Sequence, residues 1–116
     1  MADPRDHLPL KPVDLELLLA LADEERHGYG LLQTIAAHTD GLITLDPGNL
    51  YRVIKRLMES GLVAEAGHRH ADDAGERRRY YRITALGGNV LAAELDRLRS
   101  LVNARQTRAL ARRWIP

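Results

Sequence analysis

Hydrophobic residues recur at helical spacing in the first half of the chain. Apolar positions at i, i+3, i+4 and i+7 from Leu15 predict a short amphipathic helix over residues 13–22, with these side chains on its buried face. A second helix is predicted over 30–38, where leucine, isoleucine and alanine again share one side. The residues before them, 1–12, contain three prolines and no apolar period, and they predict a flexible N-terminal arm.

A third predicted helix has a well-marked start. Asp46 can cap its first turn, and Pro47 takes a position at which the missing N–H costs nothing. The helix runs to about residue 60 and ends at Gly61. Its apolar side chains form one narrow stripe, which indicates a single buried face. The opposite arc is polar and mostly basic, with Tyr51, Arg52, Lys55 and Glu59, and with Arg56 at its edge.

The pattern changes from helix to strand after this point. Residues 62–66 predict a strand, 67–75 a polar loop, and 78–83 a return strand, so that the three segments form a hairpin. Thr84 can then cap a last helix, predicted as one long helix to about Arg112. The predicted fold is therefore mainly α with a small β-hairpin, a winged helix-turn-helix with a long C-terminal helix.

Composition limits the chemistry open to this chain. Its 116 residues predict one compact unit, and the absence of cysteine excludes disulfides, thiolate metal sites and a cysteine nucleophile. No apolar run approaches the roughly 20 residues of a membrane span, and the N-terminus lacks the apolar stretch of a signal peptide. We therefore expect a cytoplasmic protein without a membrane partner. No catalytic group, metal site or cofactor site is predicted, so an enzyme is not expected.

The net charge of +1 conceals a strong segregation of charge. Residues 13–26 carry five acids and one arginine, whereas 97–113 carry six arginines and no acid. A further basic cluster precedes the end of the hairpin. A helix with a basic outer face fits the major groove of DNA, and a basic hairpin can reach neighbouring phosphates. The predicted DNA-binding residues are Asn49, Tyr51, Arg52, Lys55, Arg56, Arg77, Arg78 and Arg79, with Asn49 and Arg52 as base readers and Lys55 and Arg56 as phosphate contacts.

Four stretches together resemble the PadR family of bacterial transcriptional regulators. They are His27-Gly28-Tyr29-Gly30, then Gly48-Asn49-Leu50-Tyr51 followed by Lys55-Arg56-Leu57, then Glu59-Ser60-Gly61-Leu62-Val63, and Gly75-Glu76-Arg77-Arg78-Arg79-Tyr80-Tyr81-Arg82-Ile83-Thr84 with Gly87 after it. The resemblance covers about residues 14–113 and implies a dimeric DNA-binding regulator of the short form. Arg52 departs from the pattern, because many relatives carry proline there.

The stretch that begins at His27 is not a dinucleotide-binding fingerprint, because it lacks the third glycine and no strand leads into it. We interpret it as a helix-start turn. Tyr29 then either donates to a DNA phosphate from that helix start or simply packs. His68 and His70, with two aspartates nearby, are interpreted as loop residues rather than as a metal site.

The last predicted helix carries a seam of apolar residues at spacings of four, three and four, which is typical of a coiled coil. Leu91, Leu95, Leu98 and Val102 are therefore the predicted dimer interface. The resemblance also implies dimerisation through this helix and a place for a small-molecule effector at the dimer interface. Trp114 either anchors the helix end or stacks on such an effector.

These observations divide the chain into an arm over 1–12, a winged-helix DNA-binding domain over 13–83 and a C-terminal dimerisation helix over 84–116. The expected function is that of a homodimeric transcriptional regulator, a repressor, on a double-stranded pseudo-palindromic operator. Two alternatives remain open. One is a winged-helix module that binds another protein, and the other is a metal-sensing regulator similar to MarR or ArsR proteins.

Overall fold

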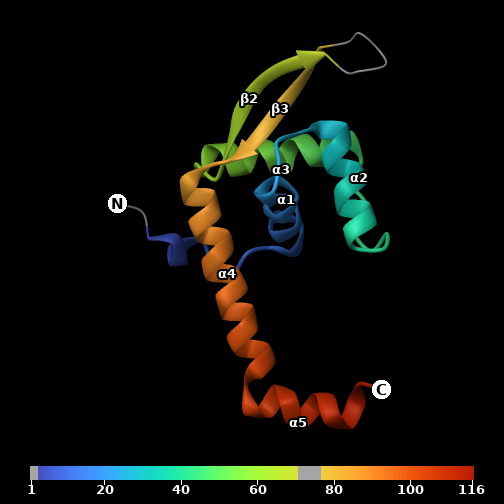
Figure 1. The fold of residues 1–116 in the computed structure, drawn as a ribbon, viewed down its shortest axis with the longest axis vertical. Coiled ribbons are helices and arrows are strands. Elements are labelled where there is room, and N and C mark those ends of the chain that lie inside the picture. Colours follow the sequence, from blue (N-terminus) through green and yellow to red (C-terminus); the bar gives the residue numbers. More distant parts are fainter. Residues whose placement is uncertain (1–2, 71–76) are drawn as a thin grey trace.

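The computed structural model describes residues 3–70 and 77–116, and for 68–70 and 77 it describes the backbone alone. Helices dominate, and a small sheet lies at one end of the molecule (Figure 1). The elements are η1 Pro4–His7, α1 Pro12–Ala22, β1 Arg26–His27, α2 Gly28–His38, α3 Pro47–Glu59, β2 Val63–His70, β3 Arg77–Ile83, α4 Ala85–Asn103 and α5 Arg105–Trp114. This is the predicted winged helix-turn-helix.

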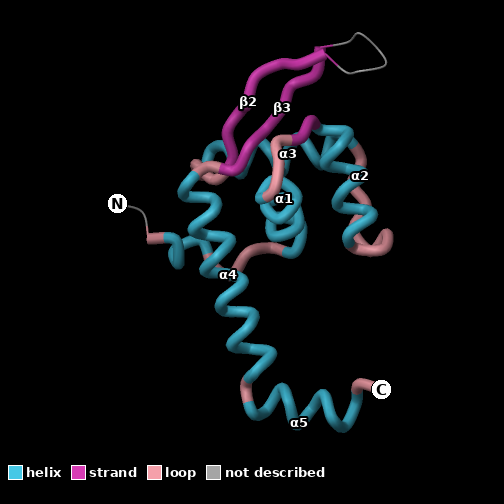
Figure 2. Tube along the Cα trace, viewed as in Figure 1, coloured by secondary structure: helices cyan, strands magenta, loops and turns pink. Residues whose placement is uncertain are grey.

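The sheet is antiparallel with the order β1-β3-β2. The hairpin of β2 and β3, called the wing below, projects beyond the helices (Figure 2). The short strand β1 was not predicted, because two residues are too few to show an alternating pattern. It places Arg26 opposite Tyr81 and His27 opposite Tyr80. The chain just before α2 is thereby joined to the base of the wing.

One hydrophobic core holds the three N-terminal helices, the sheet and the start of α4 together. The apolar stripe of α3 is buried as predicted, with Leu50, Ile54 and Leu57 at most 2% exposed. The predicted face of α1 is wrong, since Leu15 is only half-buried whereas Leu17 is fully buried. Because α1 is apolar almost all round, its periodicity does not select a face.

The predicted helix caps are present. The Asp46 carboxylate accepts the Asn49 N–H at 2.8 Å, and the Thr84 hydroxyl accepts the Gly87 N–H at 3.0 Å. Besides donating its N–H to the cap, Gly87 allows a close approach between two segments, which the sequence alone did not indicate. A Cβ at Gly87 would lie 2.1 Å from the carbonyl oxygen of Leu62, so only glycine lets α4 approach the start of β2 this closely.

The C-terminal helix differs from the single helix predicted to Arg112. It is interrupted at Ala104, whose backbone is extended (φ −62°, ψ 145°), and α5 leaves α4 at a steep angle (Figure 1). Neither glycine nor proline occurs between residues 89 and 115, so the sequence carried no usual sign of a break.

The N-terminal segment also differs from the free arm expected over 1–12. Residues 4–7 form η1, which packs against α4. The Leu10 N–H donates to Glu94 at 2.7 Å, and this carboxylate is 1% exposed. Arg97 donates to the same side chain. Its hydrogen bonds from Arg97 and Leu10 lower the pKa of Glu94, so the carboxylate is ionised and holds the segment on α4.

Candidate nucleic-acid interface

The outer arc of α3 is polar, exposed and adjacent to the wing. Tyr51 and Lys55 on α3 and Arg79 on β3 line one cavity of about 500 Å³. Tyr51 and Arg79 also line a second cavity, of about 240 Å³, together with Tyr29 at the start of α2. Three elements therefore share one continuous surface, as the sequence predicted for a helix and a basic hairpin.

The first turn of α3 holds its polar side chains in a chain of hydrogen bonds. The Asn49 amide nitrogen donates to Asp46 at 2.8 Å, and an Arg52 guanidinium nitrogen lies 3.4 Å from the Asn49 amide oxygen. Asn49 and Arg52 are exposed, and Arg52 forms no ion pair with a described carboxylate. Lys55 is also exposed and forms no ion pair with the described residues. These two cations are available to an outside partner.

Arg56 stands apart from this group. It donates two hydrogen bonds to Asp14 on α1, of 2.8 Å and 2.6 Å, and Asp14 is 4% exposed. The hydrogen bond to Asp14 raises the pKa of Arg56. The guanidinium therefore ties α1 to α3, although the Arg56 side chain remains 42% exposed, and its predicted phosphate contact stays a prediction. Sequence reasoning missed this pair because the two residues lie 42 positions apart.

Tyr51 lies against the turn before α2. A Cβ at Gly28 would come within 3.0 Å of the Tyr51 hydroxyl, so glycine provides the space in which this ring sits. The side chain nevertheless remains 52% exposed. Tyr51 thus connects the outer arc of α3 with the start of α2, and its hydroxyl faces the smaller cavity.

Arg78 on β3 is held between two rings. Its guanidinium carbon lies 5.8 Å from the centre of the Tyr29 ring, within the range of a cation–π contact. On its other side, one guanidinium nitrogen lies 3.2 Å from Nε2 and 3.5 Å from Nδ1 of His27. The His27 Nδ1 accepts the N–H of Gly30 at 3.0 Å and so caps α2. His27 was not predicted as a site residue.

The remaining wing arginines differ in what the structure describes. Arg79 lies 3.4 Å from Glu65 on β2, and both side chains are about half exposed, so we expect this pair to be weak. The side chain of Arg77 lies outside the described residues, as do those of His68 and His70 and the whole of 71–76. Of the two adjacent tyrosines, Tyr81 is buried and Tyr80 is not, as their alternation predicts.

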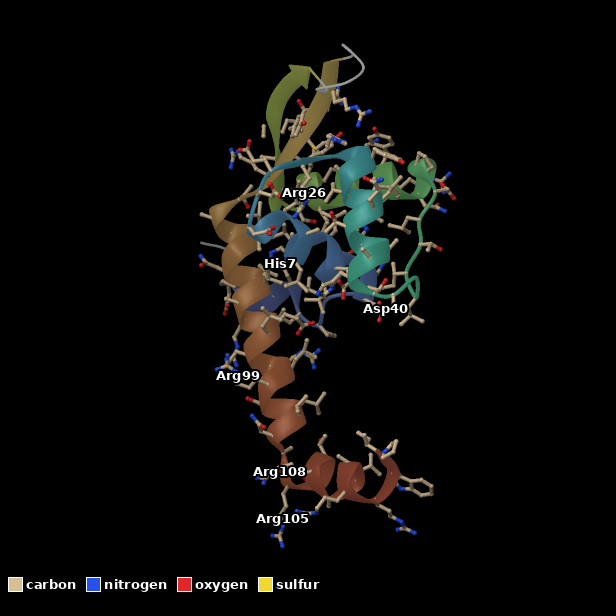
Figure 3. The ribbon with its side chains drawn as sticks, turned by 45° about the vertical axis from the view of Figure 1, so that its right-hand side comes forward. His7, Arg26, Asp40, Arg99, Arg105 and Arg108 are labelled. Atoms are coloured by element: carbon tan, nitrogen blue, oxygen red, sulfur yellow. The ribbon has the colours of Figure 1, made fainter. Side chains whose placement is uncertain are left out.

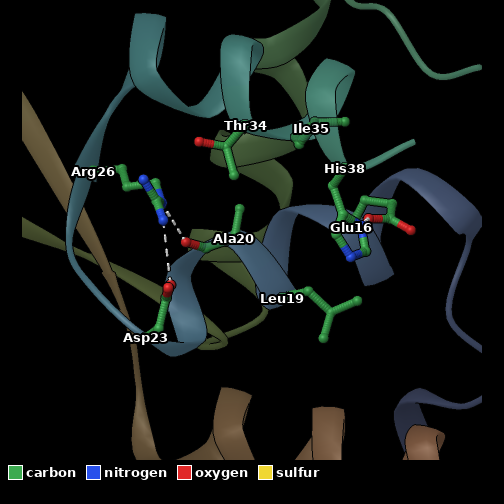
Figure 4. Close-up of a pocket in the computed structure, with 8 residues that line it drawn as sticks. All are labelled: Glu16, Leu19, Ala20, Asp23, Arg26, Thr34, Ile35 and His38. Atoms are coloured by element: carbon green, nitrogen blue, oxygen red, sulfur yellow. Dashed lines mark hydrogen bonds and ion pairs between the residues drawn. The ribbon is translucent and has the colours of Figure 1, made fainter. Parts of the chain in front are cut away.

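A pocket between α1 and α2, of about 190 Å³, lies outside this interface (Figure 4). Its polar groups contact one another: His38 lies 2.7 Å from Glu16, and Arg26 donates to the Ala20 carbonyl and contacts Asp23. No group of three or more metal-ligating side chains occurs among the described residues. In the same part of the chain, no helix is both long and apolar enough to cross a membrane.

The predicted dimer seam is only partly on the surface. Leu91 is 5% exposed and belongs to the core of its own chain, which corrects its assignment to the interface. Leu95 and Val102 are exposed and Leu98 is half-buried. The structure adds exposed apolar residues that the seam did not include: Leu101, Leu110, Trp114 and Ile115. Arg99, Arg105 and Arg108 lie along the same end of the molecule, far from the wing (Figure 3).

Comparison with known proteins gives consistent matches. The model of the transcriptional regulator PadR-like family matches residues 17–93. Uncharacterized protein X of Lysinibacillus sphaericus is 36% identical over 75 residues, which cover 65% of this chain and 67% of that protein. A PadR family transcriptional regulator from Eggerthella lenta is 28% identical with a TM-score of 0.60, covering 86% of this chain and 79% of its own.

Bacillus subtilis PadR in complex with operator DNA has the same fold. Its TM-score is 0.63 at 17% identity, and the match covers 75% of this chain but 48% of that one. At this identity the likeness is one of fold alone. It places a winged helix of this kind on DNA in another protein.

Proposed function

Because the chain belongs to the PadR-like family of transcriptional regulators, which are DNA-binding proteins and not enzymes, we propose that it is a repressor that binds a pseudo-palindromic operator as a homodimer. The observation that carries the proposal is the exposed arc of α3. Arg52 and Lys55 point outward there without a carboxylate partner among the described residues, beside the arginines of β3. Cations left unpaired on one exposed face suit a polyanionic groove.

In this proposal α3 enters the major groove. Asn49 and Arg52 lie in its first two turns, where base edges are read, and arginine suits guanine while asparagine suits adenine. Lys55, one turn further on, contacts a phosphate, and the Tyr51 hydroxyl donates to the backbone. Arg56, whose guanidinium also pairs with Asp14, stays a predicted phosphate contact at the edge of the arc.

The second part of the contact set surrounds the α2 start. Tyr29, Arg78 and Arg79 line the smaller cavity together with Tyr51, so two arginines and two tyrosines border it. Such a group of donors suits a DNA phosphate. Arg77 is placed in the contact set on its position in β3 alone.

The dimer is proposed on the apolar surface of α4 and α5. Leu95, Leu101, Val102, Leu110, Trp114 and Ile115 are each at least 40% exposed in the single chain, and the half-buried Leu98 lies between Leu95 and Val102 on the predicted seam. An apolar surface of this extent is typical of a contact between protein copies. Residues 13–83 then form the DNA-binding domain and 84–116 the dimerisation segment. We place a small-molecule effector site in this interface beside Trp114, and the protein in the cytoplasm.

Selection of bound duplexes from a random library tests the proposal. Two half-sites related by a two-fold axis, about one helical turn or about 34–36 Å apart, are expected in the recovered sequences. Recovery of no enriched sequence, at a salt concentration low enough for random duplex to bind, contradicts operator recognition. An enriched motif without symmetry contradicts the dimeric mode.

A further inference from the structure

His27 occupies the joint between α2 and the wing, and its ring makes three contacts at once. Nδ1 accepts the Gly30 N–H at 3.0 Å, and the ring stands edge-on to Tyr80 with 5.3 Å between ring centres. The third contact is the Arg78 nitrogen described above. An atom nearly equidistant from both ring nitrogens lies over the ring face, because in the ring plane it would overlap the carbon between them.

This geometry requires a neutral imidazole. The Gly30 N–H needs a lone pair on Nδ1, so the ring proton lies on Nε2. A guanidinium over the face of a neutral ring is attracted to it, whereas an imidazolium there would repel it. Burial and the charge of Arg78 both lower the pKa of His27, in agreement with this arrangement.

Other charged groups face His27 from each neighbouring element. Glu24, Glu25 and Arg26 line one cavity together with His27, and Tyr51 and Arg79 line a second cavity with it. Glu24 contacts the Arg26 guanidinium at 3.0 Å, so its charge is shared with a cation. The carboxylates favour protonation of His27, but the Gly30 donor and the adjacent Arg78 oppose it at contact distance.

We propose that His27 is a positioning residue for DNA binding: its neutral ring seats Arg78 beside Tyr29, and protonation of the ring releases Arg78. The proposal rests on the function proposed above, in which Arg78 and Tyr29 contact a phosphate. Protonation removes the acceptor that caps α2 and sets two cations face to face. The consequence is a DNA affinity that falls as the pH falls through the pKa of His27.

The test compares wild-type protein with His27→Asn. Asparagine is a good N-cap, so α2 keeps its first turn, but it has no ring and does not titrate. The probe is a fluorescent duplex of random sequence at low salt, because a phosphate contact is independent of sequence. We expect wild type to bind about tenfold more tightly at about pH 7.5, and the two proteins to converge as the pH falls below the pKa of His27, which the NMR titration described below measures.

Both proteins retain His68 and His70 in the wing. The ratio of the two affinities therefore cancels the contribution of these histidines to the pH dependence. A matched control is His38→Asn at the far end of α2, whose affinity is expected to follow wild type at every pH. An affinity ratio that stays constant as the pH falls through the measured pKa of His27 overturns the proposal. Binding by neither protein at any pH contradicts the proposed function instead.

A second measurement needs no DNA. The His27 ring is titrated by NMR in wild type and in Arg78→Gln, which removes the cation but keeps a polar side chain. The His27 pKa is expected to rise in the variant, because one of the two causes of its lowering is gone. An unchanged His27 pKa contradicts the proposed contact between Arg78 and the ring, independently of whether the protein binds DNA.

Discussion

At two adjacent glycines at the start of α4, substitution by alanine is expected to change the free energy of unfolding in opposite directions. In Gly87→Ala the new Cβ would lie 2.1 Å from the Leu62 carbonyl oxygen and 2.9 Å from a side-chain carbon of Ile83. The Leu62 carbonyl oxygen is held in place, because it accepts the Thr84 N–H at 3.1 Å and Leu62 is 2% exposed. Gly88→Ala, in contrast, meets no atom within 4 Å.

The magnitudes follow from these surroundings. Alanine in place of glycine inside a helix stabilises it by about 1 kcal/mol, and this is the expected gain for Gly88→Ala. Overpacking costs roughly 1–3 kcal/mol or more, and here a backbone contact must open by more than an ångström. We expect Gly87→Ala to lower the free energy of unfolding by about 2 kcal/mol net of the gain in helix propensity.

Urea denaturation followed by circular dichroism measures both variants. The midpoint is expected to rise for Gly88→Ala and to fall for Gly87→Ala, with little change in the slope m. If Gly87→Ala is as stable as wild type, the close approach of α4 to β2 is wrong. Failure of both variants to fold would contradict the open space assigned to Gly88.

Further predictions concern the pairs and surfaces that support the interface. Arg56→Ala leaves the buried Asp14 carboxylate without its partner and is expected to cost about 3 kcal/mol in urea denaturation, while Arg56→Ala in an Asp14→Ala background costs little. The pKa of Glu94 is lowered from 4.5, so its contribution to the free energy of unfolding is complete above that pH and is lost as the pH falls below it. Glu94→Gln is therefore expected to reduce the fall in the free energy of unfolding measured between neutral and acidic pH. Leu98→Asp is expected to yield folded monomers in sedimentation at micromolar concentration, whereas Ser100→Asp on the opposite face of α4 stays dimeric; a dimeric Leu98→Asp contradicts the proposed interface.

Much of the fold could be predicted because its signals are local. Asp46 and Thr84 cap helices through side chains three residues from the N–H groups they accept, and the stripe of α3 has one clear period. The break at Ala104 and the docking of residues 4–10 on α4 could not be predicted. They depend on contacts between distant segments, such as that from Leu10 to Glu94.

In the candidate site, too, the features set by local sequence were predicted and those set by contacts between distant segments were not. Position on a helical wheel was enough to place Tyr51, Arg52 and Lys55 outward, and the structure agrees. Wheel position did not reveal that Arg56, at the edge of the arc, pairs with Asp14, nor that Leu91 on the seam lies in the core. The role of His27 needed β1, because pairing with β3 brings the ring to Arg78.

The outer arc of α3 is proposed to read DNA, and substitutions of Arg52 and Lys55 test this role because both residues lie on the same exposed arc. The measurement is a salt titration of Arg52→Ala and Lys55→Ala on the selected duplex and on random duplex. Arg52→Ala is expected to cost about 1–3 kcal/mol per half-site on the selected duplex only.

Lys55→Ala is expected to weaken both duplexes alike. It should lower the slope of log K against log salt by about 1.8 in magnitude, from about 0.9 for one phosphate in each of two half-sites. Equal losses on both duplexes for Arg52→Ala, together with an unchanged salt slope for Lys55→Ala, would contradict the claim that this face of α3 lies in the groove.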